Sequence, residues 1–264
     1  MSLEQFQLND QVALVTGAGK GIGAAIATLF AEAGADVALT ARTQSDLENV
    51  AESIRTIGRR ALVIPGDVND LDFLQQLVEQ TVAELGGLQI LVNNAGGTLS
   101  RSFMETSVAQ LEKSFHFNVS VPFELSRLAV PHMLASNGGN IINIGSMAGE
   151  FAVRGSLAHS LTKSAVAQLT RLSAADLSPR IRVNAVLPGA IETDALAGYL
   201  DMMDASVREV MLERTAMRRN GTAEDIANAA LYLASPAANW VTGKLLSVDG
   251  KSEENLIPSP LPDL

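Results

Sequence analysis

The 264-residue sequence has no cysteine, and only 18% of its residues are charged. Without cysteine the chain can form neither disulfides nor thiolate bonds to a metal, and this composition suits a reducing compartment. Lysine and arginine are outnumbered by aspartate and glutamate, which leaves a formal net charge of −10. Such a balance disfavours a general attraction to nucleic acid or to anionic membranes. We therefore expect neither as a partner.

Long hydrophobic runs are also missing. Apolar stretches such as residues 12–15 and 141–144 are far shorter than the roughly 20 residues that span a bilayer. Polar and acidic residues are interspersed throughout the first ten residues, so they lack the apolar core of a secretory signal. These features predict a soluble, cytoplasmic protein.

What the sequence does contain is an alternation of short apolar runs with longer segments of helical period. This alternation is typical of a parallel sheet covered by helices, and fully apolar runs fit strands that are buried on both faces. The expected strands are residues 12–16, 36–40, 61–64, 89–92, 140–144, 181–187 and 244–248. We predict an α/β protein with one domain over residues 1–264: a Rossmann fold with a doubly wound, seven-stranded parallel sheet and helices on both faces. A proline-containing tail, residues 252–264, is either loosely ordered or used in assembly.

A glycine-rich loop follows the first expected strand directly and precedes an alanine-rich helix. Gly17 permits a tight turn, Gly21 lets the backbone approach a pyrophosphate, and Gly23 allows the helix to pack closely on the sheet. The start of that helix offers unpaired N–H groups to phosphate oxygens. An ordinary tight turn is the alternative. The strand before the loop and the helix after it favour a dinucleotide site formed by residues 17–23, with Lys20 and Ile22 among its members.

The end of the second expected strand indicates which dinucleotide binds. An acidic residue there would favour NAD by accepting hydrogen bonds from the ribose, but the sequence reads Thr-Ala-Arg. Arg42 and Lys20 can converge on a 2′-phosphate, which favours NADP(H) over NAD(H). Alternatively, both are solvated surface cations. Asp67 and Val68, which follow the third strand, are placed by chain order to flank the adenine.

These motifs, taken in order, resemble those of the short-chain dehydrogenase/reductase family from Val12 to about Gly250. The spacing of the glycine loop resembles the family's glycine motif, and Asn93-Asn94-Ala95-Gly96 resembles its motif after the fourth strand. Further along, the matching positions are the family's helix asparagine, its serine after the fifth strand and its nicotinamide-contacting loop: Asn118, Ser146 and Pro188-Gly189 through Thr193.

The resemblance implies a function and an assembly. It implies hydride transfer between a nicotinamide cofactor and a ketone or secondary alcohol, with Ile191 and Thr193 holding the carboxamide. The other residues that it implies for cofactor binding are Asn94, Ala95, Gly96, Lys163, Pro188 and Gly189. It also implies a homotetramer, or else a dimer, built through long helices at residues 108–135 and 158–177. The identity of the small carbonyl or alcohol substrate does not follow from the fold.

One residue departs from the family's pattern. The family places a tyrosine four residues before a lysine, so that both side chains lie on one face of a helix. Here the lysine is Lys163, but His159 stands four residues before it, and the only tyrosines are Tyr199 and Tyr232. Asn118 and Ser146 remain in place. The hydroxyl that would give its proton to the carbonyl oxygen is therefore absent.

Two interpretations of His159 stay open. Imidazole can act as an acid or base near neutral pH, so His159 can replace the phenol. Against this, imidazole is shorter than phenol, and the charge of Lys163, with desolvation if the site is buried, should lower the pKa of His159. The chain is then either an NADP(H)-dependent oxidoreductase with weak or altered activity, or a degenerate NADP(H)-binding protein that acts as a sensor or as an oligomer subunit.

Other site types are disfavoured. His116 and His132 lack the carboxylate and histidine partners of a metal site, so we predict no metal. Ser146 lacks the Gly-X-Ser-X-Gly elbow of a hydrolase. Residues 194–219 are rich in Met, Leu and Ala and predict helices that form a lid over the substrate. Within this segment Met202, Met203 and Met211 either line an apolar pocket or pack against the domain.

Overall fold

The computed structural model describes residues 3–201 and 206–252, and it contains the predicted seven-stranded parallel sheet. The strand order is β3-β2-β1-β4-β5-β6-β7, and every pairing is parallel. The strands are β1 (Val12–Thr16), β2 (Asp36–Thr40), β3 (Ala61–Val63), β4 (Ile90–Asn93), β5 (Gly139–Ile144), β6 (Ile181–Pro188) and β7 (Leu245–Val248). The doubly wound Rossmann fold predicted from the sequence is confirmed.

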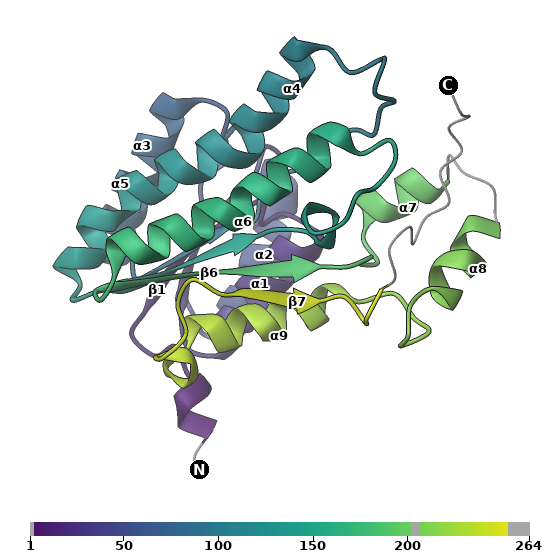
Figure 1. Ribbon diagram of the computed structural model, residues 1–264. Helices are drawn as coiled ribbons and strands as arrows, with labels where there is room; N and C mark the ends of the chain where they lie inside the picture. Colours follow the sequence, from purple (N-terminus) through teal and green to yellow (C-terminus); the bar gives the residue numbers. More distant parts are fainter. Residues whose placement is uncertain (1–2, 202–205, 253–264) are drawn as a thin grey trace.

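Helices cover both faces of the sheet (Figure 1). On one face α1 (Gly21–Glu32), α2 (Gln44–Thr56) and α9 (Ala223–Ala234) enclose a core of aliphatic side chains. On the other, α3 (Leu71–Leu85) and α5 (Val121–Ala135) enclose a second core, and α6 (Leu157–Leu177) packs beside them. Because both faces are covered, β1, β2 and β4 are buried at every position. This explains why their central residues are consecutively apolar rather than alternating, with polar residues only at strand ends.

The helix predicted at residues 108–135 is interrupted, which corrects the sequence-based expectation. It consists of α4 (Val108–Phe115), a π-helical turn at His116–Ser120 and α5. Pro122 stands at the start of α5 and has no N–H to donate to the carbonyl of Asn118, which removes one bond of the helical ladder. The N–H of Val121 instead bonds to the carbonyl of His116, five residues back. The resulting bulge contains Asn118, whose side-chain amide donates to the carbonyl of Ser114, four residues back.

The segment predicted as a lid contains two short helices, α7 (Asp194–Leu200) and α8 (Ser206–Glu213). Both lie beyond the carboxyl ends of β6 and β7 (Figure 1). Met211 is completely buried, so it packs against the domain rather than lining an open pocket. Met202 and Met203 lie outside the described residues, as does the tail from 253 to 264. Within the described ranges, none of the helices is long and apolar enough to cross a membrane.

Candidate active site

The glycine loop between β1 and α1 has the backbone that its sequence demands. Gly17 and Gly21 adopt φ values of +64° and +54°, which residues with a side chain rarely adopt. A Cβ atom on Gly23 would lie 2.3 Å from the carbonyl oxygen of Gly17. The start of α1 can therefore approach the end of β1 only where a residue has no side chain. The Lys20 side chain does not cap α1, so the first N–H groups of this helix are available to an anion.

A hydrogen-bond network fixes this loop to the segment after β4. The Thr16 hydroxyl accepts hydrogen bonds from the backbone N–H groups of Asn94 and Ala95, each at 3.0 Å. In return the Asn94 side-chain amide donates to the carbonyls of Thr16 and Gly17, at 2.9 and 3.2 Å. Two segments that are 77 residues apart in sequence thus form one rigid floor. The part of Thr16 in this floor was not predicted, although the residue lies immediately before the predicted loop.

The loop after β6 approaches the glycine loop from the other side. A Cβ atom on Gly21 would lie 3.2 Å from the methyl carbon of Thr193, so these two predicted cofactor residues are neighbours. Pro188 ends β6 opposite Val248, and Gly189 is close-packed against Asp249. A small cavity of about 100 Å³ lies behind this loop.

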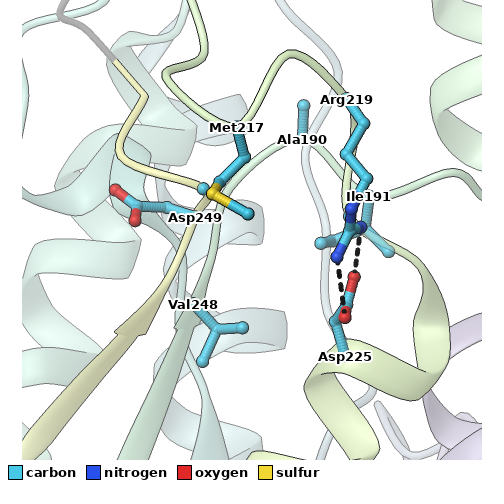
Figure 2. A pocket seen from close by; sticks show the side chains of 9 residues that line it. Ala190, Ile191, Met217, Arg219, Asp225, Val248 and Asp249 are labelled. Atoms are coloured by element: carbon cyan, nitrogen blue, oxygen red, sulfur yellow. Dashed lines mark hydrogen bonds and ion pairs between the residues drawn. The ribbon is translucent and has the colours of Figure 1, made fainter.

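This cavity shows what holds the loop in place (Figure 2). The backbone of Ile191 pairs with that of Gly221, and the Arg219 guanidinium forms an ion pair with Asp225 at 2.6 Å. Figure 2 shows this pair beside Ile191, with Val248 and Asp249 on the opposite wall. Ligand pockets enclose roughly 300–1,000 Å³, so the cavity is too small for a dinucleotide. The contacts in its walls, the Ile191–Gly221 pairing and the Arg219–Asp225 ion pair, instead hold the loop that was predicted to bind the carboxamide.

Cations and a carboxylate lie at the exits of β2 and β3, where the adenosine end was predicted. The Asp67 carboxylate accepts hydrogen bonds from Asn69, and these, together with the nearby cations Arg42 and Lys113, lower its pKa. The Lys20 ammonium lies 3.4 Å from the carboxylate of Asp46 in the first turn of α2. Val68 is buried in the second core. Arg42 therefore lies near Asp67, whereas Lys20 is paired with Asp46, a residue that the sequence analysis did not single out.

Asn118 and Lys163 meet below Gly96. The Asn118 side chain donates to the carbonyls of Ser114 and Gly97 at 2.9 and 3.1 Å, and its oxygen accepts from the N–H of Gly97 at 2.9 Å. The Lys163 ammonium donates to the carbonyl of Ile144 at 2.8 Å. A Cβ atom on Gly96 would lie 2.9 Å from the Asn118 oxygen and 3.4 Å from the Lys163 nitrogen. Burial lowers the pKa of Lys163 to about 8.

His159 lies one turn before Lys163 on α6, as predicted. Its Nδ1 atom is buried and has no hydrogen-bond partner, which is costly unless a bound molecule supplies one. Burial, and secondarily the charge of Lys163, lower the pKa of His159 to about 4. The imidazole is therefore neutral at neutral pH. The sequence analysis named the lysine charge first, but burial is the larger cause.

Ser146 follows β5, beside the start of α6. Its hydroxyl oxygen accepts a hydrogen bond from the N–H of Ala148 at 3.1 Å, so its proton remains available to a substrate oxygen. The short turn that it begins packs on α6, because a Cβ atom on Gly149 would lie 2.8 Å from the carbonyl carbon of Lys163. Ser146, His159 and Lys163 therefore belong to one packed unit. Among the described residues no cluster of His, Asp and Glu is suited to a metal ion.

The buried imidazole predicts a specific dependence of stability on pH. The pKa of His159 is about 4 in the folded state and about 6.5 in an unfolded chain. As the pH falls from 6.5 to 4, the unfolded state gains a proton that the folded state does not. The contribution of His159 to the free energy of unfolding should therefore be fully present above pH 6.5 and fall by about 3 kcal/mol through this window.

Urea unfolding of the wild type and of His159→Gln at several pH values between 4 and 7 measures this contribution. The wild type should lose about 3 kcal/mol more than the variant over that range, since both lose equally from other groups. Parallel stability curves would contradict the assignment.

Comparisons with known proteins agree in one direction. Residues 17–250 match the family model described as enoyl-(acyl carrier protein) reductase. The chain is 47% identical over its whole length to an uncharacterized oxidoreductase of Mycobacterium tuberculosis, which it also covers completely. It is 38% identical to the 7alpha-hydroxysteroid dehydrogenase of Escherichia coli, over 96% of this chain and 98% of that one. A structure of a 7alpha-hydroxysteroid dehydrogenase complexed with NADH and 7-oxo glycochenodeoxycholic acid superposes with a TM-score of 0.92 at 37% identity, covering 97% and 99% of the two chains.

Proposed function

The chain belongs to the short-chain dehydrogenase/reductase family and is an oxidoreductase, and from that premise we propose that it transfers hydride between NADP(H) and a ketone or secondary alcohol. The observation that carries the proposal is the convergence of three segments at the carboxyl ends of the strands. These are the glycine loop, the loop that bears Thr193, and the group of Asn118, Lys163 and His159.

Each segment has a distinct task in this proposal. The N–H groups of residues 21–23 bind the pyrophosphate at the start of α1. Ile191 and Thr193 bind the carboxamide, and Lys163 binds the nicotinamide ribose from the position that its hydrogen bond to the Ile144 carbonyl gives it. When bound, the nicotinamide supplies or accepts the hydride. Ser146 donates its hydroxyl proton as a hydrogen bond to the substrate oxygen, which stabilises the negative charge that develops there.

His159 acts on the same oxygen as a neutral imidazole. With a pKa of about 4, the ring is not in its imidazolium form at neutral pH and has no acidic proton to transfer to the carbonyl. A neutral ring can still donate one hydrogen bond, and its buried, unpartnered Nδ1 has no group of the protein to satisfy it. We therefore propose slow or altered catalysis rather than none. The ring stabilises the developing oxyanion, and the proton comes from elsewhere, such as water.

Turnover distinguishes this proposal from its rival, an NADP(H)-binding protein without redox chemistry that acts as a sensor or an oligomer subunit. The rival is favoured by the same low pKa of His159. A panel of ketones that includes steroids, cyclohexanones and 3-oxoacyl thioesters, incubated with NADPH, should contain at least one compound that is reduced stereospecifically. Tight NADPH binding without oxidation across the panel would support the rival.

Arg42 carries a testable part of the NADP(H) preference. It lies at the exit of β2, where an acid would favour NAD(H). Substituting Arg42→Ala should weaken NADPH binding roughly tenfold, because a charge-assisted bond to the 2′-phosphate is lost. NADH binding should change little, since NADH has no such phosphate. Dissociation constants for both nucleotides measure the effect; equal losses would remove Arg42 from phosphate recognition.

We also propose that the protein is cytoplasmic and assembles as a homotetramer, with a dimer as the alternative. Large apolar side chains remain exposed on the helices that the family resemblance implicates. They include Phe115 at 47%, Phe123 at 51%, Leu161 at 50% and Leu172 at 56% exposure. Trp240, next to β7, is exposed completely. A second copy of the chain would bury this apolar surface.

A further inference from the structure

The Lys20 ammonium, one of two cations assigned to the 2′-phosphate, already has an anionic partner. Its nitrogen lies 3.4 Å from a carboxylate oxygen of Asp46, whose side chain is only 24% exposed. Asp46 comes from the first turn of α2, 26 residues further along the chain. Its carboxylate is paired with Lys20 and not with Arg42. The pair thus spans the space between the glycine loop and the start of α2.

Close packing holds Asp46 in this position. A Cβ atom on Gly19 would lie 3.0 Å from the Cβ atom of Asp46 and 3.6 Å from that of Ala41. Gly19 therefore sits against both the exit of β2 and the first turn of α2. The Ala18 N–H also bonds to the carbonyl of Thr40 at 3.1 Å, which fixes the loop to the end of β2. These two contacts, Gly19 against Asp46 and Ala18 with Thr40, keep the Asp46 carboxylate beside the glycine loop.

We propose that Asp46 determines how strongly the protein prefers NADP(H), because it competes with the 2′-phosphate for Lys20. This inference rests on the proposed function, in which Lys20 and Arg42 receive that phosphate. The phosphate carries up to two negative charges, so it is repelled by a carboxylate within a few ångströms and must separate the ion pair in order to bind. The uncharged 2′-hydroxyl of NADH meets neither penalty. Asp46 thus reduces the discrimination that the two cations would otherwise give.

Substituting Asp46→Asn tests this directly, because asparagine keeps the size of the side chain and removes its charge. NADPH should bind roughly three- to tenfold more tightly to the variant, whereas NADH affinity should stay within about twofold of the wild type. The gain should shrink in high salt, since the pair is partly exposed. Dissociation constants for both nucleotides, at low and high ionic strength, give the ratio of affinities.

Glu52→Gln is the matched control. It removes the same charge from the same helix, but six residues further along and with a side chain that is 76% exposed beside Arg55. If the effect came from net charge or from the stability of α2, this control would change the affinity ratio as much as Asp46→Asn. The inference requires the control to leave the ratio unchanged. Thermal unfolding of both variants verifies that they are folded.

A second background tests the route through Lys20. In Lys20→Met the ion pair is gone, so adding Asp46→Asn should raise NADPH affinity less than it does in the wild type. An equal gain in both backgrounds would overturn the competition. So would an unchanged ratio in Asp46→Asn, or a loss of NADH affinity beyond about threefold, which would show that Asp46 binds the ribose hydroxyls. A wild type that prefers NADH would instead refute the proposed NADP(H) specificity, and the shift in ratio would still decide the role of Asp46.

Discussion

Replacing His159 with tyrosine should raise the rate of ketone reduction by about 100-fold, within the 10²–10⁴ that a well-placed general acid contributes. The phenol is longer than imidazole, and it would carry an ionisable proton into the space that Nδ1 now faces without a partner. The buried Lys163 ammonium, one turn away, would stabilise a phenolate and lower the pKa of the new tyrosine. Steady-state kcat for a ketone with saturating NADPH measures the gain.

Two further variants separate a catalytic gain from a general one. His132→Tyr makes the same replacement near the end of α5, and it should leave kcat unchanged. Adding Ser146→Ala to His159→Tyr should remove most of the gain, because the two hydroxyls act on the same oxygen. Unchanged turnover in His159→Tyr would show that position 159 does not carry the chemistry.

The fold was predictable because its sheet is covered on both faces. Strands that are buried on both sides have a consecutively apolar centre, so β1 and β2 have the bounds that were predicted. The other strands differ by one residue at one end, or at both ends in β4. The π-helical turn at His116–Ser120 was not predictable from apolar spacing, since the pattern of buried residues continues through it. Pro122 was the available signal, but proline is also common in the first turn of a helix.

The site was predictable only where a motif fixes the backbone. The positive φ values of Gly17 and Gly21 follow from the loop's sequence and context. The pairing of Lys20 with Asp46 did not, because charges on separate elements have no common periodicity. The direction of the pKa shift at His159 was predicted from the Lys163 charge and from desolvation if the site is buried, but burial itself, the larger cause, depends on how α6 packs. The roles of these residues in catalysis and cofactor binding stay predictions.

Gly23→Ala should weaken cofactor binding strongly, although it alters no residue of the catalytic group. Its Cβ atom would lie 2.3 Å from the Gly17 oxygen and 2.5 Å from the Asn94 amide nitrogen. These two atoms, 3.2 Å apart, form one of the hydrogen bonds that join the glycine loop to the segment after β4. The first atom belongs to the backbone, and the second is held by hydrogen bonds to the Thr16 and Gly17 carbonyls. The loop must therefore move, and the overpacking should cost about 1–3 kcal/mol of unfolding free energy.

Gly23→Ala should show a large loss of NADPH affinity under conditions in which the variant is still folded. A misplacement of about 1 Å can cost 10²-fold in reaction rate. We expect a loss of similar size, roughly 100-fold, in NADPH affinity when the phosphate-binding N–H groups are displaced, while the protein remains folded. Gly198→Ala is the control, because a Cβ atom at Gly198 meets nothing within 4 Å. Calorimetric titration with NADPH, alongside urea unfolding of the two variants, separates the two effects. If Gly23→Ala binds NADPH as the wild type does, the close approach of α1 to β1 is not what creates the pyrophosphate site, and the proposed binding mode fails with it.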